Sequence, residues 1–453
     1  MLIKNDNGSY NIQSKEGNKY LKVQNDIIVI SDLIANDSSF EFYIEIPNQL
    51  FIQNEATYDD ESKYVTSTTD TLLNKTYYDI DSNTGLTKSI INSNGYKTEY
   101  TYDSKKQLIK VKNSEKEINY VYNNQNLLSE INNNNVNYKF IYDEFNNTKN
   151  VKIGDDVTLI TNNYEPNNGN LISSLYGNNQ STSYEYDEFN RIKKMTKMDN
   201  VYNYKYGNNG DLIKVIDNDN VYKYTYDDSK RLCEYQNNDF IIKYKYDIND
   251  NILNKYYKYN NISHSIENTY NDEESISKTT FDNNVMNYSY DNLGRLINKN
   301  INNNLSTNYK YVTNGNRTSL LVDTIEINNT KYKYDYDKLG NIINIYNNDV
   351  LEYEYSYDEY NQLLKENNYI NNTTTRYKYD NYGNILYKKI YYLGTYNQIS
   401  QNIYEYKNNS FKDLLTKFNN EEILYDDIGN PINVGNKILT WINGRQLQSY
   451  SDS

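Results

Sequence analysis

A Tyr-x-Tyr-Asp pattern recurs sixteen times in this chain, at intervals of 19 to 27 residues. Regular recurrence at this spacing is typical of stacked supersecondary units that bury their apolar sides against one another. The length of 453 residues would by itself suggest two to four domains. The repeat overrides this estimate and favours one long array. The second tyrosine of the pattern, the anchor tyrosine, is Tyr102, Tyr122, Tyr142, Tyr164, Tyr186, Tyr206, Tyr226, Tyr246, Tyr270, Tyr290, Tyr311, Tyr336, Tyr357, Tyr379, Tyr406 or Tyr425.

The residues around each anchor predict a β-hairpin. Twelve repeats carry a second Tyr two residues earlier, and residues i and i+2 of a strand share one face. Ten repeats carry Asp directly after the anchor, and twelve carry Gly, Asn or Asp four residues after it, where a tight turn requires positive φ. Eleven repeats then have Leu or Ile six residues after the anchor, which begins the returning strand. We therefore expect an all-β fold, a spiralling array of hairpins.

The residues that define this pattern best are assigned a structural role in the repeat. Repetition argues against catalysis, because an active site is not needed in sixteen copies. We interpret the Asp residues as turn caps, since the repeat surrounds them with amides and phenols only. These structural residues are Tyr288, Tyr290, Asp291, Gly294, Arg295 and Leu296, then Tyr334, Tyr336, Asp337 and Gly340, then Tyr377, Tyr379, Asp380 and Gly383, and finally Tyr425, Asp426, Gly429 and Trp441.

Charge and hydropathy exclude several partners. The net charge is −14 without a concentrated basic block, so we expect no nucleic-acid binding. No apolar run approaches the roughly 20 residues of a transmembrane helix, so we expect no membrane span. The N-terminus lacks the apolar core of a signal peptide. The chain is then either part of a longer polypeptide or exported by another route.

Candidate reactive residues are few, and we predict no catalytic, metal or cofactor site. A single cysteine, Cys233, excludes an internal disulfide and occupies a packing position within a repeat. The single histidine, His264, falls in a polar stretch that we interpret as a linker between repeats, and a Ser-His-Asp triad around it is disfavoured. Residues 79–90 superficially resemble a calcium loop, but Gly85 falls one position late and Ile90 replaces the closing Glu, so a hairpin turn is favoured.

Three regions are predicted along the chain. Residues 1–57 lack the repeat and read as four short strands at 8–12, 19–23, 27–30 and 40–44, a segment that either caps the array or forms a lectin-like lobe of the ricin type. Residues 58–410 form the repeat array. Residues 411–453, with the only Trp, form a specialised terminal repeat. Both end segments are placed to cover strand edges of the array.

The sequence resembles the Rhs/YD-repeat protein family. The signature Tyr-x-Tyr-Asp-x-x-Gly-Arg-Leu is intact at residues 288–296, and the resemblance extends over roughly residues 58–453. Residues 150–155 and the closing Gly429-Asn430-Pro431, Trp441 and 444–447 are similar to wall-associated YD-repeat proteins of clostridia. The resemblance implies a β-ribbon that spirals into a hollow shell. In Rhs effectors, insecticidal toxin-complex C components and teneurins, such a shell carries or displays a C-terminal domain.

The resemblance also implies a function. The leading hypothesis is a non-catalytic shell, the encapsulating or display scaffold of a polymorphic toxin or cell-surface effector, secreted from or on the surface of a bacterium. Its partner would be a C-terminal effector domain or a second chain that completes the shell. The family's self-cleavage at Asp-Pro is not expected, because no Pro here follows Asp. The alternative is an adhesin that binds carbohydrate or cell wall through exposed tyrosine faces.

Simple geometry gives the scale of such a shell. About 32 strands spaced ~4.8 Å apart make a ribbon on the order of 150 Å long. Twisted sheets of that length curl. A single turn of such a ribbon would have a radius of about 25 Å. We expect the shell to be partial or open, because only residues 1–57 are available to plug an end.

Overall fold

The computed structural model describes residues 50–452 except 115, 134, 135, 382, 409–412 and 443, together with four strands in the first 49 residues. Its described residues contain β-strands, turns and bends, and no helix. The all-β prediction is confirmed. Among these residues no helix exists that is long and apolar enough to cross a membrane.

The chain divides into two compact units. The smaller unit comprises residues 1–52 and 313–318, and contains β1 (Leu2–Lys4) paired with β2 (Tyr10–Ile12) and β3 (Lys19–Gln24) paired with β4 (Ile27–Asp32). Three of the four strands predicted in this region lie at these positions. The fourth, at 40–44, lies outside the described residues, and side chains of the first 49 residues are not described, so the lectin-like lobe stays a prediction.

A parallel bridge between Phe51 and Arg317 joins the two segments of this smaller unit. The Phe51 N–H donates to the Asn316 carbonyl at 3.0 Å, and the Thr318 N–H donates to the Phe51 carbonyl at 2.9 Å. Residues 313–318 are the tip of a long hairpin, and they therefore hold the end of the N-terminal segment by backbone hydrogen bonds.

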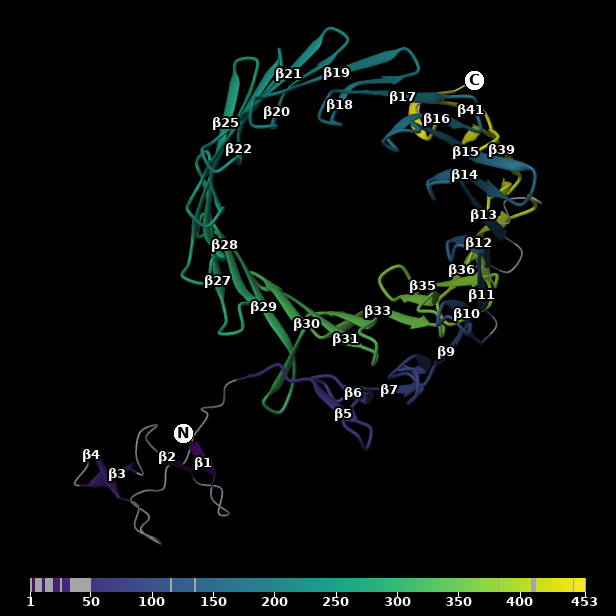
Figure 1. The fold of residues 1–453 in the computed structure, drawn as a ribbon. Helices are drawn as coiled ribbons and strands as arrows, with labels where there is room; N and C mark the ends of the chain where they lie inside the picture. Colours follow the sequence, from purple (N-terminus) through teal and green to yellow (C-terminus); the bar gives the residue numbers. More distant parts are fainter. Residues whose placement is uncertain are drawn as a thin grey trace. The chain divides into compact units, whose positions relative to one another are not determined.

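The larger unit, residues 53–312 and 319–453, consists of one antiparallel sheet whose 38 strands follow sequence order (Figure 1). Strands of four to eight residues dominate, as expected from the spacing of the repeat. Their bounds are β5 (Glu55–Tyr58), β6 (Val65–Thr69), β7 (Lys75–Ile80), β8 (Thr87–Ile91), β9 (Lys97–Tyr102), β10 (Leu108–Asn113), β11 (Lys116–Tyr122), β12 (Leu128–Asn133), β13 (Val136–Tyr142), β14 (Thr148–Ile153), β15 (Val157–Tyr164), β16 (Leu171–Tyr176), β17 (Ser181–Tyr186), β18 (Ile192–Lys197), β19 (Asn200–Tyr206), β20 (Leu212–Asp217), β21 (Asn220–Tyr226), β22 (Leu232–Gln236), β23 (Phe240–Tyr246), β24 (Ile252–Tyr259), β25 (Ile262–Tyr270), β26 (Ile276–Phe281), β27 (Asn284–Tyr290), β28 (Leu296–Ile301), β29 (Leu305–Asn314), β30 (Arg317–Ile327), β31 (Thr330–Tyr336), β32 (Ile342–Asn347), β33 (Val350–Tyr357), β34 (Leu363–Asn368), β35 (Thr373–Tyr379), β36 (Ile385–Tyr392), β37 (Gln398–Glu405), β38 (Lys417–Phe418), β39 (Glu421–Tyr425), β40 (Pro431–Val434), β41 (Lys437–Ile442) and β42 (Gln446–Asp452).

The sheet is open at its ends. Strand β5 pairs with β6, strand β42 pairs with β41, and no ladder joins β5 to β42 in the part of the chain that the structure describes. Every residue of β5 and β42 is exposed. The prediction of an open, spiralling hairpin array is therefore confirmed.

The sheet has very little conventional hydrophobic core. Among the described residues only Ile153, Val215 and Ile428 are buried hydrophobic side chains. Most tyrosines of the repeat are half-buried, lying against neighbouring strands of the same ribbon. The ribbon is thus stabilised mainly by its ladders and by side-chain packing along its own surface.

The ribbon coils so that later strands lie against earlier ones (Figure 1). The Ser93 hydroxyl, in the loop between β8 and β9, donates to the Lys338 carbonyl, in the loop between β31 and β32, at 3.0 Å. The Ser114 hydroxyl likewise contacts the Glu359 carboxylate, and the Tyr360 hydroxyl donates to the Asn113 carbonyl at 3.4 Å. Each of these pairs of loops is separated by 23 strands. The ribbon therefore makes more than a single turn.

Candidate functional site

Each repeat turn is built around the Asp that follows the anchor tyrosine. In the clearest copy, Oδ1 of Asp291 accepts the Leu293 N–H at 2.9 Å and the Arg295 N–H at 3.0 Å. Its Oδ2 accepts Nε of Arg295 at 2.8 Å and pairs with the same guanidinium through Nη2 at 2.6 Å. Burial pushes the pKa of Asp291 upward, but the Arg295 side chain and the backbone N–H groups outweigh it, and the pKa is lowered.

The other predicted turns have the same construction. Asp337 accepts the N–H groups of Leu339 and Asn341, each at 2.9 Å. Asp380 accepts the N–H of Asn384 at 2.9 Å, and Asp426 that of Asn430 at 2.8 Å. The carboxylates therefore act as caps, each organising its own turn.

The fourth residue after the anchor has positive φ in these turns, as the Gly and Asn residues predict. The angle is 74° at Gly294, 86° at Gly340, 90° at Gly383 and 85° at Gly429. Lys106, Lys230 and Glu274 also adopt positive φ at this position, of 67°, 63° and 62°. The hairpins of these three repeats were predicted, but the residue types at the fourth position did not indicate positive φ, because the hairpin imposes that conformation on residues that do not favour it.

The anchor tyrosine has a second role that the sequence pattern did not reveal. Its hydroxyl donates to a backbone carbonyl of the preceding repeat, in most repeats at the start of the returning strand, as from Tyr290 to Ile276 at 2.8 Å. That strand has a β-bulge at its start, and its ladder with the next strand begins only at Lys278, so the Ile276 carbonyl stands outside that ladder. The tyrosines that make this bond are Tyr122, Tyr142, Tyr164, Tyr186, Tyr206, Tyr226, Tyr246, Tyr270, Tyr290, Tyr311, Tyr336, Tyr357, Tyr379 and Tyr425.

Burial of the tyrosines changes their titration. Desolvation raises the pKa of Tyr355 and of Tyr406 to about 12, and nearby carboxylates add to the effect. Burial also raises the pKa of Tyr290, Tyr334, Tyr336, Tyr377, Tyr379 and Tyr425. Tyrosines at i and i+2 of one strand share a face and stack in places, as Tyr353 and Tyr355 of β33 do with ring centroids 6.1 Å apart. The phenol rows are therefore packed into the ribbon in their neutral form.

The candidate reactive residues lie in ordinary structural positions. The interpretation of His264 as part of a linker was wrong, because it lies within β25, opposite Tyr257. Its Nδ1 is 2.6 Å from Oδ2 of Asp282, and its ring stacks on Phe281. Both contacts of His264 are therefore with the adjacent hairpin. The linker interpretation failed because a stretch of polar residues forms a strand as readily as a loop.

The remaining candidates also form parts of hairpins. Sγ of Cys233 donates to the Thr225 carbonyl at 3.3 Å, within a strand pair. Residues 79–90 form a hairpin turn between β7 and β8, as predicted. There the Lys88 ammonium and backbone N–H groups lower the pKa of Asp81 to about 2. No group of three or more His, Cys, Asp or Glu side chains suited to hold a metal occurs among the described residues.

The most elaborate site lies where the closing segment meets an earlier turn of the coil. The loop between β16 and β17 carries Asn178 and Gln180, which contact Asp426, Trp441 and Gly444. Nε1 of Trp441 donates to the Pro431 carbonyl at 2.7 Å and so fixes the closing segment internally. Of the predicted structural residues, the coil brings together Asp426, Gly429 and Trp441 here, whereas the others remain spread along the ribbon.

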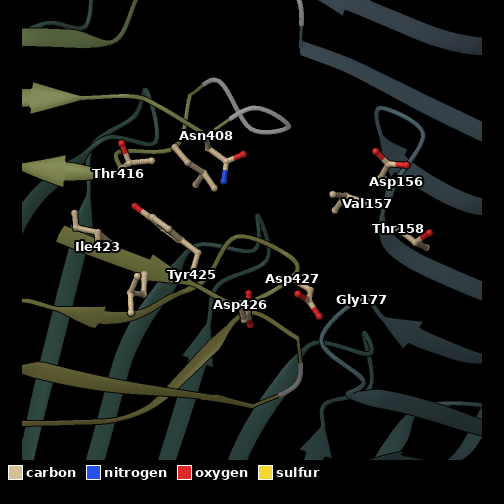
Figure 2. A pocket seen from close by; sticks show the side chains of 12 residues that line it. Asp156, Val157, Thr158, Gly177, Asn408, Thr416, Ile423, Tyr425, Asp426 and Asp427 are labelled. Atoms are coloured by element: carbon tan, nitrogen blue, oxygen red, sulfur yellow. The ribbon is translucent and has the colours of Figure 1, made fainter.

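A cavity of about 630 Å³ opens beside this contact (Figure 2). Asp156, Val157, Thr158 and Gly177 line it from the earlier turn, and the later turn contributes Asn408, Leu414, Thr416 and residues 423–427. In Figure 2 the two groups of side chains face one another across the opening. The cavity is therefore a space between successive turns of the ribbon.

Comparisons with known proteins identify the fold. No family model and no curated protein sequence matches this chain. Solved structures do match, including the TcdB2–TccC3 complex, with a TM-score of 0.59 and 12% identity over 98% of this chain. The Photorhabdus luminescens Tc holotoxin pore gives 0.58 and 12% over 99%. This chain corresponds to 28% of the length of each of those chains. The chain thus shares the fold of part of each of those chains.

Proposed function

We propose that this protein is a non-catalytic YD-repeat shell that encloses or displays an effector domain of a polymorphic toxin or cell-surface effector. The observation that carries this proposal is the coil, in which one 38-strand ribbon returns upon itself after 23 strands and binds its own earlier loops. A ribbon whose successive turns are bonded to one another forms a continuous wall. The fold shared with the TcdB2–TccC3 structures, one of which is described as lacking a hypervariable C-terminal region, supports the same role.

The placement of the tyrosines supports a shell over a carbohydrate-binding adhesin. A sugar-binding face needs exposed aromatic rings in a row. The anchors from Tyr102 to Tyr425 are half-buried, and fourteen are bonded to a backbone carbonyl of the preceding repeat. The well-exposed tyrosines include Tyr259 and Tyr396, at or beside hairpin loops, and Tyr77 within β7, and they do not continue from repeat to repeat. Binding to carbohydrate or cell wall therefore stays a prediction, and we assign no residues to it.

The proposed partner is an effector domain or a second chain that completes the shell. The exposed end strands β5 and β42 give such a partner a place to continue the ladder. We place the protein outside the bacterial cell or on its surface, because effector delivery requires it. We propose no turnover by this chain, since its Asp residues organise turns and His264 is engaged by a neighbouring hairpin.

Protection of a cargo tests this proposal. A short, unstructured peptide with a protease site is fused after Ser453, and its cleavage is compared with that of the same peptide added free to the unfused protein. A shell lowers the cleavage rate of the fused peptide at least tenfold. Equal rates for the fused and free peptides would refute encapsulation. A peptide fused to an unrelated open β-sheet protein controls for the effect of tethering.

A further inference from the structure

The loop between β16 and β17 is shaped to present two amide side chains. The Tyr176 N–H donates to the Gln180 carbonyl at 2.8 Å, and the Asn179 N–H donates back to the Tyr176 carbonyl at 2.9 Å, with Asn179 at a φ of 64°. Oδ1 of Asn178 accepts the Gln180 N–H at 3.4 Å. The loop is therefore closed by its own backbone, and Nδ2 of Asn178 is left to bond elsewhere.

Both amides bind the closing segment. Nε2 of Gln180 donates to the Trp441 carbonyl at 2.5 Å, and its Oε1 accepts the Gly444 N–H at 2.7 Å. This pair of bonds imitates the way a neighbouring strand would satisfy the same backbone groups. Nδ2 of Asn178 donates to Oδ2 of Asp426 at 3.0 Å and to the Gly444 carbonyl at 3.1 Å. One loop thus holds two separate turns of the closing segment.

Close packing makes the contact specific. A Cβ on Gly444 would lie 2.8 Å from the Tyr176 ring, and one on Gly177 would lie 2.6 Å from Cγ2 of Ile428. Ile428 is 1% exposed, and Asn430, whose Nδ2 donates to the Gly444 carbonyl at 2.7 Å, is 4% exposed. Glycine at both positions therefore lets the two surfaces meet without a gap.

The other contacts between turns are weaker. The Ser93 hydroxyl makes one exposed hydrogen bond, to the Lys338 carbonyl. The exposed contact from Ser114 to Glu359 is joined by the Tyr360 hydroxyl, which donates to the Asn113 carbonyl at 3.4 Å, and by the Lys116 ammonium over the Tyr360 ring at 3.7 Å. Each closing strand is also hydrogen-bonded to its chain neighbour, but the ladder between β39 and β40 has only three paired positions. The closing strands therefore depend on the β16–β17 loop more than the other strands depend on contacts with another turn.

We propose that the loop formed by residues 176–180 is a latch that holds the closing segment, residues 421–452, on the earlier turn of the coil. When the latch is released, β39–β42 separate from β15–β17 and the cavity of Figure 2 opens, while the rest of the ribbon keeps its ladder. The latch rests on the contacts between turns and does not depend on the proposed cargo function.

Hydrogen exchange of the full chain, followed by mass spectrometry, tests the latch. In the double variant Asn178→Ala with Gln180→Ala, we expect exchange to become at least tenfold faster in peptides from 421–452 and to stay unchanged in peptides from β20–β28. The matched control, Asn209→Ala with Asn238→Ala, removes two exposed amides from the loops between β19 and β20 and between β22 and β23, and should change neither region. Unchanged exchange in 421–452, or equal acceleration throughout the ribbon, would overturn the proposal.

A milder variant keeps the test usable if the double variant fails to fold. Asn178→Ala alone keeps both bonds of Gln180 and removes only the amide that donates to Oδ2 of Asp426 and to the Gly444 carbonyl. We expect a smaller acceleration, about threefold, in the same peptides. No acceleration in this variant would likewise contradict the latch. The cargo-protection assay is read separately, so a shell without a latch and a latch without a shell give different results.

Discussion

Two parts of the ribbon are built from the same repeat but are held in different ways. Strands β18–β28 contact their chain neighbours through ladders and tyrosine hydroxyls, as in the bond from Tyr226 to Leu212. Strands β39–β42 have these contacts and also bind the loop between β16 and β17, 23 strands earlier through Asp426 and 25 strands earlier through Gly444. The repeat therefore encodes the ribbon, and departures from the repeat encode how the ribbon binds itself.

Glycine shows this difference most clearly. A Cβ at Gly294 would meet nothing within 4 Å, so glycine is needed at this position only for the φ of 74°. A Cβ at Gly177 would lie 2.1 Å from the Thr158 carbonyl oxygen, yet the φ of Gly177 is not in the left-handed region. One glycine provides a backbone conformation, and the other provides space between two surfaces.

Alkaline pH should have the largest effect, because it acts on the whole ribbon. Burial raises the pKa of Tyr355 and Tyr406 to about 12, above the unfolded value near 10. Between these values the folded state retains protons that the unfolded state has lost, so the stabilisation is complete below about pH 10 and is lost as pH rises toward 12. We expect the urea midpoint to fall steeply above pH 10, together with the appearance of tyrosinate absorbance. A midpoint constant from pH 9 to 11.5 would contradict the packing of the tyrosines.

Gly177→Val should have the next largest effect and should act on the closing segment. The new side chain would overlap the Thr158 carbonyl and Cγ2 of Ile428, and overpacking of this kind costs about 3 kcal/mol or more. We expect a lower denaturation midpoint and early exchange in 421–452. Gly294→Val, at a glycine with open surroundings, should leave the exchange of 421–452 unchanged. Equal effects of the two substitutions on that segment would remove the distinction between the two regions.

Tyr290→Phe should have a smaller effect that stays within the ribbon. The substitution leaves the Ile276 carbonyl without its hydroxyl donor, and an unsatisfied partly buried carbonyl costs about 1–3 kcal/mol. Tyr259→Phe, at a side chain that is 60% exposed, should change stability by less than about 0.5 kcal/mol. The two variants are compared by urea melts at pH 7. Equal melts would show that the anchor hydroxyl is dispensable.

The regular part of the molecule was predictable because its signals are local. An Asp at the start of a turn, a Gly or Asn four residues after the anchor, and tyrosines at i and i+2 each act within one hairpin, so the pattern around Tyr290 predicts strand, turn and strand without knowledge of the coil. The open array was expected because only residues 1–57 were available to plug an end. The fold was therefore accessible from the sequence alone.

The latch and the hydroxyl bonds of the anchor tyrosines were not predictable, since each depends on contacts outside the residue's own hairpin. Asn178 and Gln180 look like ordinary loop residues in a chain rich in Asn, and nothing local indicates a partner 248 to 266 residues away. A slight signal existed at Gly444 and Trp441, where the repeat is broken, but it gave no partner. The hydroxyl bond of the anchor depends on a β-bulge in the preceding hairpin, which the pattern of residue types does not specify.

The smallest predicted effect separates conformation from space at a single turn. At Gly294 the φ of 74° penalises a β-branched side chain most, by about 1–3 kcal/mol, whereas Asn adopts this region at lower cost. Gly294→Val should therefore destabilise more than Gly294→Asn, and since a Cβ there meets nothing within 4 Å beyond its chain neighbours, the difference comes from the local backbone conformation. Asn146 and Asn190 already occupy the same turn position with φ of 69° and 59°. Equal urea midpoints for the two variants would mean that positive φ at this turn does not penalise Val more than Asn. The glycines of the array would then not be selected for φ.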